Sequence, residues 1–373
     1  MLSRELVRLR WRYRKNRDDL LGLLGGYPGF VRARSPSPTI EHIPVFCFHE
    51  VAPAVLERQL QFLAGNGYRT LDADELSLVL RRKHPCRERS VVLTFDDGTS
   101  TLSSVAYPLL RRYGLRAVAF VIPGLVPEHP TPGSPFCSWA ELRDMQSSGV
   151  IDVQAHSFHH HKVLVSPHLV DFMHPRYPGY YGNLDVPAYR TPGEEGFTRE
   201  VPLGTPIYRS EPLFTGAPEY FDDPIVRAAC VRAVEPRGEA FFAEPGWERV
   251  LRRIHRAAAA ATRVPARYGT RGDAARAIRE DLERCRAVIA GKLGGHRVRH
   301  LALPWFVGSG TAVRVARDAG YASVSWGFAG RRVVRPSDDP FSIARLNERY
   351  LERLPGVGRR PLSLCLLQGR SAA

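Results

Sequence analysis

Strand-like and helix-like segments alternate along most of this 373-residue chain, and this order constrains its fold more than any other feature. Short apolar runs predict strands at 44–49, 91–95, 116–122, 150–155, 300–303 and 323–326. Helices are predicted at 54–66, 72–82, 100–113, 138–148, 273–292 and 312–319. Repeated strand-then-helix order is typical of parallel strands. We therefore expect an α/β fold, either a barrel or a doubly wound sheet.

Two adjacent carboxylates end one of the predicted strands, in the run 94–98 (TFDDG). On an extended strand, the side chains of Asp96 and Asp97 would point to opposite faces. Where the strand ends, Gly98 can free the backbone, so that both carboxylates reach one cavity. One of them can then bind a cation while the other handles protons.

Histidines follow the strand predicted at 150–155, in the run 156–161 (HSFHHH). His156 and His160 are four residues apart and would point the same way on a helical turn. One aspartate and two histidines match the three protein ligands of a catalytic zinc-type site, which keeps a position open for water. In a barrel, catalytic groups at the carboxyl ends of strands face the active site.

Composition and charge exclude several classes of protein. With 44% hydrophobic and 24% charged residues, the chain is neither disordered nor a membrane protein, and no apolar run approaches the roughly 20 residues of a membrane span. The six cysteines are scattered, as expected of reduced thiols in the cytosol. The net charge of +15 favours an acidic partner, but no recognition pattern indicates nucleic acid.

Two segments interrupt the alternating pattern. Residues 1–38 form a basic leader and linker without a recognisable signal peptide, which predicts a cytoplasmic protein. Residues 1–35 either lie as an amphipathic helix on anionic membrane, at its inner face, or pack on the domain. Residues 162–271, rich in Pro, Tyr, Phe and Arg with one helix at 248–262, are interpreted as an insertion that shapes substrate access. The barrel would then span 39–365, insertion included, before a tail at 366–373.

The motifs resemble those of the polysaccharide deacetylases of carbohydrate esterase family 4, the NodB-homology domain, over roughly residues 43–360. The runs TFDDG at 94–98 and HSFHH at 156–160 match the family's T-F-D-D-G and H-[ST]-x-x-H. ALPW at 302–305, with Gly308, is a loose version of R-x-P-[YW]-G. DPFSIAR at 339–345 is similar to the late D-P-[YF]…R segment, and PVFCFH at 44–49 to the opening P-V-L-x-Y-H.

The resemblance implies a distorted (β/α) barrel of about seven parallel strands. It implies metal-dependent hydrolysis of an N-acetyl, or less often an O-acetyl, group on a sugar. By this resemblance Asp97, His156 and His160 hold the metal, which is Zn²⁺ with Co²⁺, Ni²⁺ and Mn²⁺ as alternatives, and Asp96 is the general base. Trp305, Pro304 and Arg345 are expected to contact the substrate, with Trp305 as a wall of the groove.

Three departures from the family pattern affect these roles. Ala302 replaces the Arg that orients the base, which leaves Arg345 as a substitute. The late L-x-H, whose His protonates the leaving amine, appears only as LSLC at 362–365, so His49 is the alternative acid. The insertion is the third departure. His159 and His161 are interpreted as bystanders, and Cys47 as a core residue.

The expected substrate is an acetylated amino sugar, free or as a nucleotide- or lipid-linked precursor. A second enzyme hypothesis is a deacylase or deformylase that uses the same metal site on a non-carbohydrate amide. Outside enzymes, a degenerate non-catalytic fold could bind a glycan or a membrane.

Overall fold

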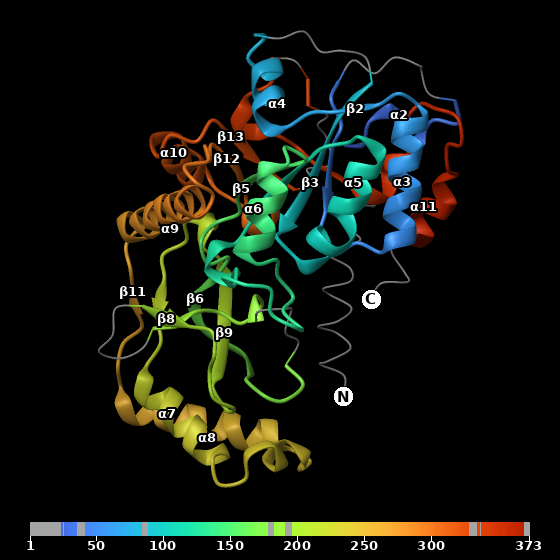
Figure 1. Ribbon diagram of the computed structural model, residues 1–373. Helices are drawn as coiled ribbons and strands as arrows, with labels where there is room; N and C mark the ends of the chain where they lie inside the picture. Colours follow the sequence, from blue (N-terminus) through green and yellow to red (C-terminus); the bar gives the residue numbers. More distant parts are fainter. Residues whose placement is uncertain are drawn as a thin grey trace. The chain divides into compact units, whose positions relative to one another are not determined.

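The computed structural model describes residues 24, 26–35, 42–83, 89–177, 183–190, 196–327, 334–335 and 337–368. Its helices and strands are labelled in Figure 1. Contacts divide the chain into two compact units. The first unit comprises Met1–Phe158, Leu282–Val307 and Ala316–Ala373, and the second comprises His159–Asp281 and Gly308–Val315. Each unit is described by itself.

The first unit is built around a sheet of eight parallel strands. They are β1 (Val45–Phe48), β2 (Arg69–Thr70), β3 (Ser90–Asp97), β4 (Ala117–Val121), β5 (Ile151–Ala155), β12 (His300–Ala302), β13 (Ser323–Ser325) and β14 (Leu346–Asn347). Seven follow the order β13-β12-β5-β4-β3-β1-β14, and β2 pairs with the start of β3. A parallel bridge from Ser325 to Ile343 links β13 to the segment that leads into β14, so the sheet curls towards closure. The predicted barrel of about seven parallel strands is confirmed.

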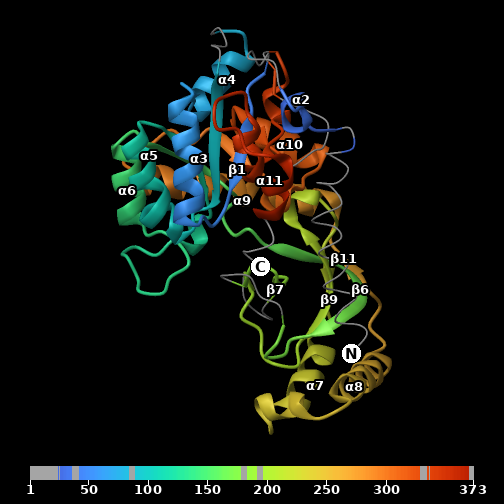
Figure 2. The ribbon, with the colours of Figure 1, turned by 90° about the vertical axis from the view of Figure 1, so that its right-hand side faces the viewer.

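Helices cover this sheet. They are α3 (Pro53–Gly65), α4 (Ala73–Leu80), α5 (Tyr107–Tyr113), α6 (Trp139–Ser147), α9 (Arg271–Lys292), α10 (Gly310–Asp318) and α11 (Leu362–Gln368). Figures 1 and 2 show α3, α5 and α6 lying along the outside of the sheet. The start of α6 agrees with its sequence, because Ser138 Oγ accepts from the Glu141 N–H while the Glu141 carboxylate accepts from the Ser138 N–H at 2.7 Å.

The strands at the centre of the sheet are buried on both faces. All eight residues of β3 and all five of β4 are buried, which explains their continuous apolar runs. Val45, Val92, Val118 and Phe120 belong to one core cluster. Each such side chain stabilises the fold by about 1.5 to 3 kcal/mol relative to an exposed one. This core keeps the strand ends, and the polar groups on them, in place.

The second unit corrects our interpretation of residues 162–271 as mostly irregular. It contains the antiparallel pair β6 (Lys162–Phe172) and β9 (Pro206–Pro212), the helices α7 (Pro224–Val234) and α8 (Trp247–Thr262), and the short strands β7 (Tyr189–Arg190), β8 (Phe197–Thr198), β10 (Tyr220–Phe221) and β11 (Arg267–Tyr268). β6 was missed because its register shifts break the alternation of apolar and polar residues. Only α8 was predicted. The role of this segment in substrate access stays a prediction.

Most of the predicted basic leader lies outside the described residues, which begin at residue 24. The part of the leader that the structure describes contains the short helix α2 (Gly29–Arg32), whose Phe30 and Val31 are buried. No helix in the described ranges is both long enough and apolar enough to span a membrane.

Candidate active site

The two aspartates lie at the carboxyl end of β3, on backbone that turns sharply. Asp97 has a φ of 68° and Gly98 a φ of 74°, both in the left-handed region. A Cβ on Gly98 would lie 3.1 Å from the Val121 side chain on β4. The sequence predicted that Gly98 releases the strand, but the turn already begins at Asp97, which an aspartate tolerates better than most residues.

The histidines lie in an irregular loop that follows β5, so the predicted helical turn is wrong. Ser157 has a φ of 66° and His160 a φ of 49°. Sparsely populated backbone conformations of this kind are often found at functional sites. The loop nevertheless brings His156 and His160 to the same place as Asp97.

Asp97, His156 and His160 form a buried group of metal-type donors. One donor atom from each residue lies within 4.8 Å of the others. His156 Nε2 is 3.2 Å from Asp97 Oδ1. The structure therefore brings together all three of the ligands that the family resemblance implied.

The orientation of His156 is set by a backbone carbonyl. His156 Nδ1 lies 2.9 Å from the oxygen of Ala302. Because a carbonyl oxygen can only accept, Nδ1 carries a proton, and Nε2 is the ring nitrogen that faces Asp97. Metal-binding histidines usually have their other ring nitrogen held in this way. Ala302 stands where the family has Arg, and it contributes its main chain rather than its side chain.

Electrostatics at this group favour a cation. Burial alone would lower the pKa of His156, but the charges of Asp96 and Asp97 and the hydrogen bond that Asp97 accepts from His156 outweigh it, so that the pKa is raised. The two carboxylates thus attract positive charge to the place where the donor atoms of His156 and His160 lie. One carboxylate and two imidazoles suit a divalent ion of the zinc type, so the residues present fit a metal.

Asp96 is fully buried and is held by Arg345. The two terminal nitrogens of Arg345 donate to the two carboxylate oxygens, at 2.6 and 2.8 Å. Burial would raise the pKa of Asp96, but the Arg345 charge opposes it and the pKa is lowered. Asp96 is therefore an ionised carboxylate in a fixed orientation, with both oxygens already bound.

Arg345 does not reach a substrate, which corrects the substrate-binding role predicted for it. Its side chain is 0% exposed and lies between the rings of Phe120 and Phe306. Its Nε donates to the Trp326 carbonyl at 2.9 Å, and one terminal nitrogen also reaches Thr94 Oγ1 at 3.3 Å. The geometry favours the other hypothesis, in which Arg345 replaces the missing arginine at position 302 and orients Asp96.

Cys47 and His49 approach Asp96 from β1 and form a second group of donor atoms within 4.8 Å of one another. Cys47 Sγ donates to Asp96 Oδ2 at 3.5 Å, and burial raises the pKa of this thiol well above its usual range. A neutral thiol and a carboxylate already bound by Arg345 make this group a poor metal site. Sequence reasoning missed Cys47 as a neighbour of Asp96, although its i, i+2 spacing from His49 placed both side chains on one face.

The segment after β12 carries Trp305, which the sequence analysis expected to form a wall of the substrate groove. Trp305 and Phe306 have φ values of 55° and 60°, and both are half-buried. The Phe306 ring also meets the His49 ring edge-on, with centroids 5.6 Å apart. Pro304 is buried and has little surface to offer a ligand. Substrate contact by Trp305 and Pro304 stays a prediction.

The neighbouring histidines behave as aromatic packing residues. The rings of His159 and His161 lie 4.7 and 4.3 Å from the ring of Phe197. Burial lowers the pKa of His161 to about 3, so it is neutral at ordinary pH.

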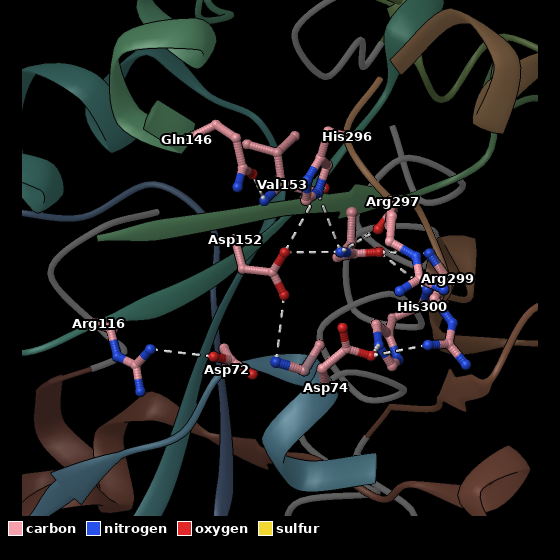
Figure 3. Close-up of polar contacts among 12 residues, drawn as sticks. Asp72, Asp74, Arg116, Gln146, Asp152, Val153, His296, Arg297, Arg299 and His300 are labelled. Atoms are coloured by element: carbon pink, nitrogen blue, oxygen red, sulfur yellow. Dashed lines mark hydrogen bonds and ion pairs between the residues drawn. The ribbon is translucent and has the colours of Figure 1, made fainter. Parts of the chain in front are cut away.

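A polar network around Asp152 and His300 links β5 to the start of β12, the strand that ends in Ala302 (Figure 3). Gln154 Oε1 accepts from the backbone N–H groups of Arg299 and His300, at 2.9 and 3.0 Å. Gln154 Nε2 donates to Asp152 at 2.7 Å. Since β12 pairs with β5 at a single register position, this network adds to the contact between these two strands, whereas β12 pairs with β13 at three positions.

Comparison with known proteins agrees with the motifs and the fold. Residues 83–173, which include both motifs, match the family model of polysaccharide deacetylases. A poly-β-1,6-N-acetyl-D-glucosamine N-deacetylase of Staphylococcus aureus is 29% identical over 115 residues, which is 31% of this chain and 39% of that protein. The matches span only 32% to 39% of the length of these curated relatives.

Solved structures show the same fold at low sequence identity. A de-N-acetylase of Aggregatibacter actinomycetemcomitans has a TM-score of 0.53 and 17% identity, covering 82% of this chain and 94% of its own. The BpsB deacetylase domain of Bordetella bronchiseptica has a TM-score of 0.52 and 16% identity, covering 84% and 98%. The family match is thus carried by residues 83–173, and the fold of the chain agrees with it.

Proposed function

We propose that the protein is a metal-dependent hydrolase that removes the N-acetyl group from an amino sugar or a sugar-containing precursor. One observation carries the proposal. A buried Asp-His-His donor set lies beside a separate carboxylate whose two oxygens are fixed by an arginine. The deacetylase relatives and the fold support the reaction class.

Asp97, His156 and His160 would hold the ion. A divalent ion there would polarise the acetamide carbonyl and lower the pKa of a water molecule to about 7. Zn²⁺ is our proposal because one carboxylate and two imidazoles match its preferred ligands, with Co²⁺, Ni²⁺ and Mn²⁺ as alternatives.

Asp96 acts as the general base. Arg345 keeps it ionised and points it in one direction, so it can accept the proton of the attacking water. Arg345 is thus a positioning residue. His49, in the same donor group as Asp96, is our proposal for the acid that protonates the leaving amine.

Release of acetate tests this function. Purified full-length protein is incubated with β-1,6-linked N-acetylglucosamine oligomers, with and without chelator, and then with each of the four divalent ions. We expect acetate release that the chelator abolishes and one ion restores. The Asp96→Asn variant controls for contaminating activity. Cleavage of a non-carbohydrate formamide but not of any acetylated sugar would favour the deformylase alternative, and no turnover of either with metal bound would favour the non-catalytic one.

A further inference from the structure

A cavity of about 540 Å³ lies at the amino ends of the strands. Arg34, Arg89, Arg353 and Arg359 line it, together with Ser35 and Gly356. Arg89 directly precedes β3, and Asp97 ends the same strand. Eight residues of strand span roughly 26 Å at about 3.3 Å per residue, so this arginine cavity is distinct from the candidate active site.

The carboxylates that the structure describes do not balance the charge of the arginine cavity. Within the described part of the chain, none of the four arginines forms an ion pair with an aspartate or glutamate. Glu352 neighbours Arg353 in sequence, but Arg58 binds its carboxylate at 2.9 Å and Arg360 lies 3.7 Å from it. The acid next to Arg353 is therefore already paired with other arginines.

Two of these arginines, one buried and one half-buried, make hydrogen bonds to neutral carbonyl groups. Arg353, 5% exposed, donates to the carbonyls of Val31, Ala33 and Arg360, at 2.8, 2.6 and 2.7 Å. Arg359 donates to carbonyls of Arg353, Arg34 and Ala33, at 2.7, 2.7 and 2.8 Å. Burial, and then the charge of Arg353, lower the pKa of Arg359 to about 10. These carbonyls accept hydrogen bonds from Arg353 and Arg359, but no described carboxylate neutralises the two positive charges.

The wall of the arginine cavity is held in place by specific contacts. Asn66 exchanges two hydrogen bonds with the backbone of Val357, at 2.7 and 3.1 Å. The Tyr68 hydroxyl donates to the Pro355 carbonyl at 2.8 Å. A Cβ on Gly356 would lie 2.5 Å from the Asn66 side chain, so only glycine fits this approach. The cavity is thus formed before any ligand arrives, which lowers the entropic cost of binding.

We propose that the arginine cavity binds a phosphate-bearing anion, with the guanidinium groups of Arg34 and Arg89 donating to its oxygens and Arg353 and Arg359 supplying the surrounding positive charge. Planar guanidinium groups match phosphate oxygens in pairs, and several arginines around one cavity favour a multiply charged anion over a single carboxylate. The phosphate can come from a lipid headgroup or from a soluble phosphate compound. Arg34 lies in the leader for which contact with anionic membrane is one of the two predictions. One arm of the test therefore uses lipid vesicles.

The test compares Arg34→Gln/Arg89→Gln with the control Arg111→Gln/Arg314→Gln, which removes two exposed charges elsewhere. In the first arm, binding of inorganic pyrophosphate to the full chain is measured by calorimetry at constant ionic strength. In the second, the proteins are sedimented with vesicles of phosphatidylcholine alone or with phosphatidylglycerol added. The single variant Arg34→Gln is measured as well, because it changes one exposed side chain and keeps the test valid if the double variant misfolds.

We expect wild type and control to bind in at least one arm, and the Arg34/Arg89 variant to bind about tenfold more weakly or worse there, as for the loss of a charge-assisted hydrogen bond. Binding in the pyrophosphate arm identifies a soluble phosphate, and binding only to phosphatidylglycerol vesicles identifies a lipid headgroup. Failure of the wild type to bind in either arm overturns the proposal. Equal loss in the control and in the Arg34/Arg89 variant also overturns it, because net charge alone would then explain the binding.

Discussion

The two ends of the parallel sheet bury arginine in different ways. At the carboxyl end, Arg345 meets the two oxygens of Asp96, and its charge is cancelled inside the protein. At the amino end, Arg353 meets three backbone carbonyls, which satisfy its donors but leave its charge. A cancelled charge can tune the chemistry of its partner, whereas an uncancelled one attracts an anion from outside. In our proposals, arginine would therefore serve a reaction at one end and binding at the other.

The largest effect is expected from Arg345→Met, which would remove the buried ion pair at the carboxyl end of the sheet. It leaves the buried charge of Asp96 without a partner, which typically costs about 3 to 5 kcal/mol of stability. Activity should fall mainly through kcat, because Arg345 orients the base without touching substrate. Metal content should be unchanged, since none of the three proposed ligands is altered. Urea unfolding, acetate release and metal analysis measure these effects.

Arg345→Lys is the matched control for that variant. It keeps the charge but loses the planar fork, so it should recover part of the stability and less of the activity. If Arg345→Met unfolds with wild-type stability, Asp96 does not depend on this ion pair, and the contrast between the two ends is lost.

A smaller effect is expected from Arg353→Met. No carboxylate of the described residues loses its partner, and water in the adjoining cavity can hydrate the three released carbonyls. We expect a loss of about 1 to 2 kcal/mol, from weakened hydrogen bonding alone. Urea unfolding of Arg353→Met and of Arg345→Met, both at low ionic strength, compares the two losses of stability. A loss as large as that of Arg345→Met would show that both ends depend equally on a buried ion pair.

An effect no larger than that of Arg353→Met concerns pH at the amino end. Burial, with the charge of Arg335, lowers the pKa of His42 from 6.5 to about 4, and His42 stacks on Phe30 of α2. The folded state prefers neutral His42, so this contribution is complete above pH 6.5 and is lost as pH falls towards 4. Since His42 is partly exposed, we expect about 1 to 2 kcal/mol. His42→Phe should narrow the difference in unfolding free energy between pH 7.5 and 4.5 by this amount. An unchanged difference would contradict the assignment.

The fold and the metal donors could be predicted from the sequence because both depend on short, local patterns. Buried parallel strands give continuous apolar runs, and the motifs at 94–98 and 156–160 follow two of them. The second unit was harder to predict. The irregular register of β6 and β9 leaves no clear period in the sequence.

The partners of the site residues could not be predicted because they depend on contacts between distant segments. Arg345 and Asp96 are 249 positions apart, and the carbonyl that orients His156 belongs to Ala302, whose side chain carries no signal. The arginine cavity joins segments from residues 34, 89 and 353–361. Such arrangements follow from the topology of the sheet rather than from any local motif.

Metal analysis of four purified variants, beside the wild type, tests the central claim most directly. A neutral amide is a much poorer ligand than a carboxylate, so Asp97→Asn should lose the metal, as should His156→Ala and His160→Ala. Asp96→Asn should keep the metal and lose activity by about 10² to 10⁴, as expected for a missing general base. Metal lost from the Asp96 variant but retained by the Asp97 variant would reverse the two roles, and a wild-type protein that binds no metal would contradict the account.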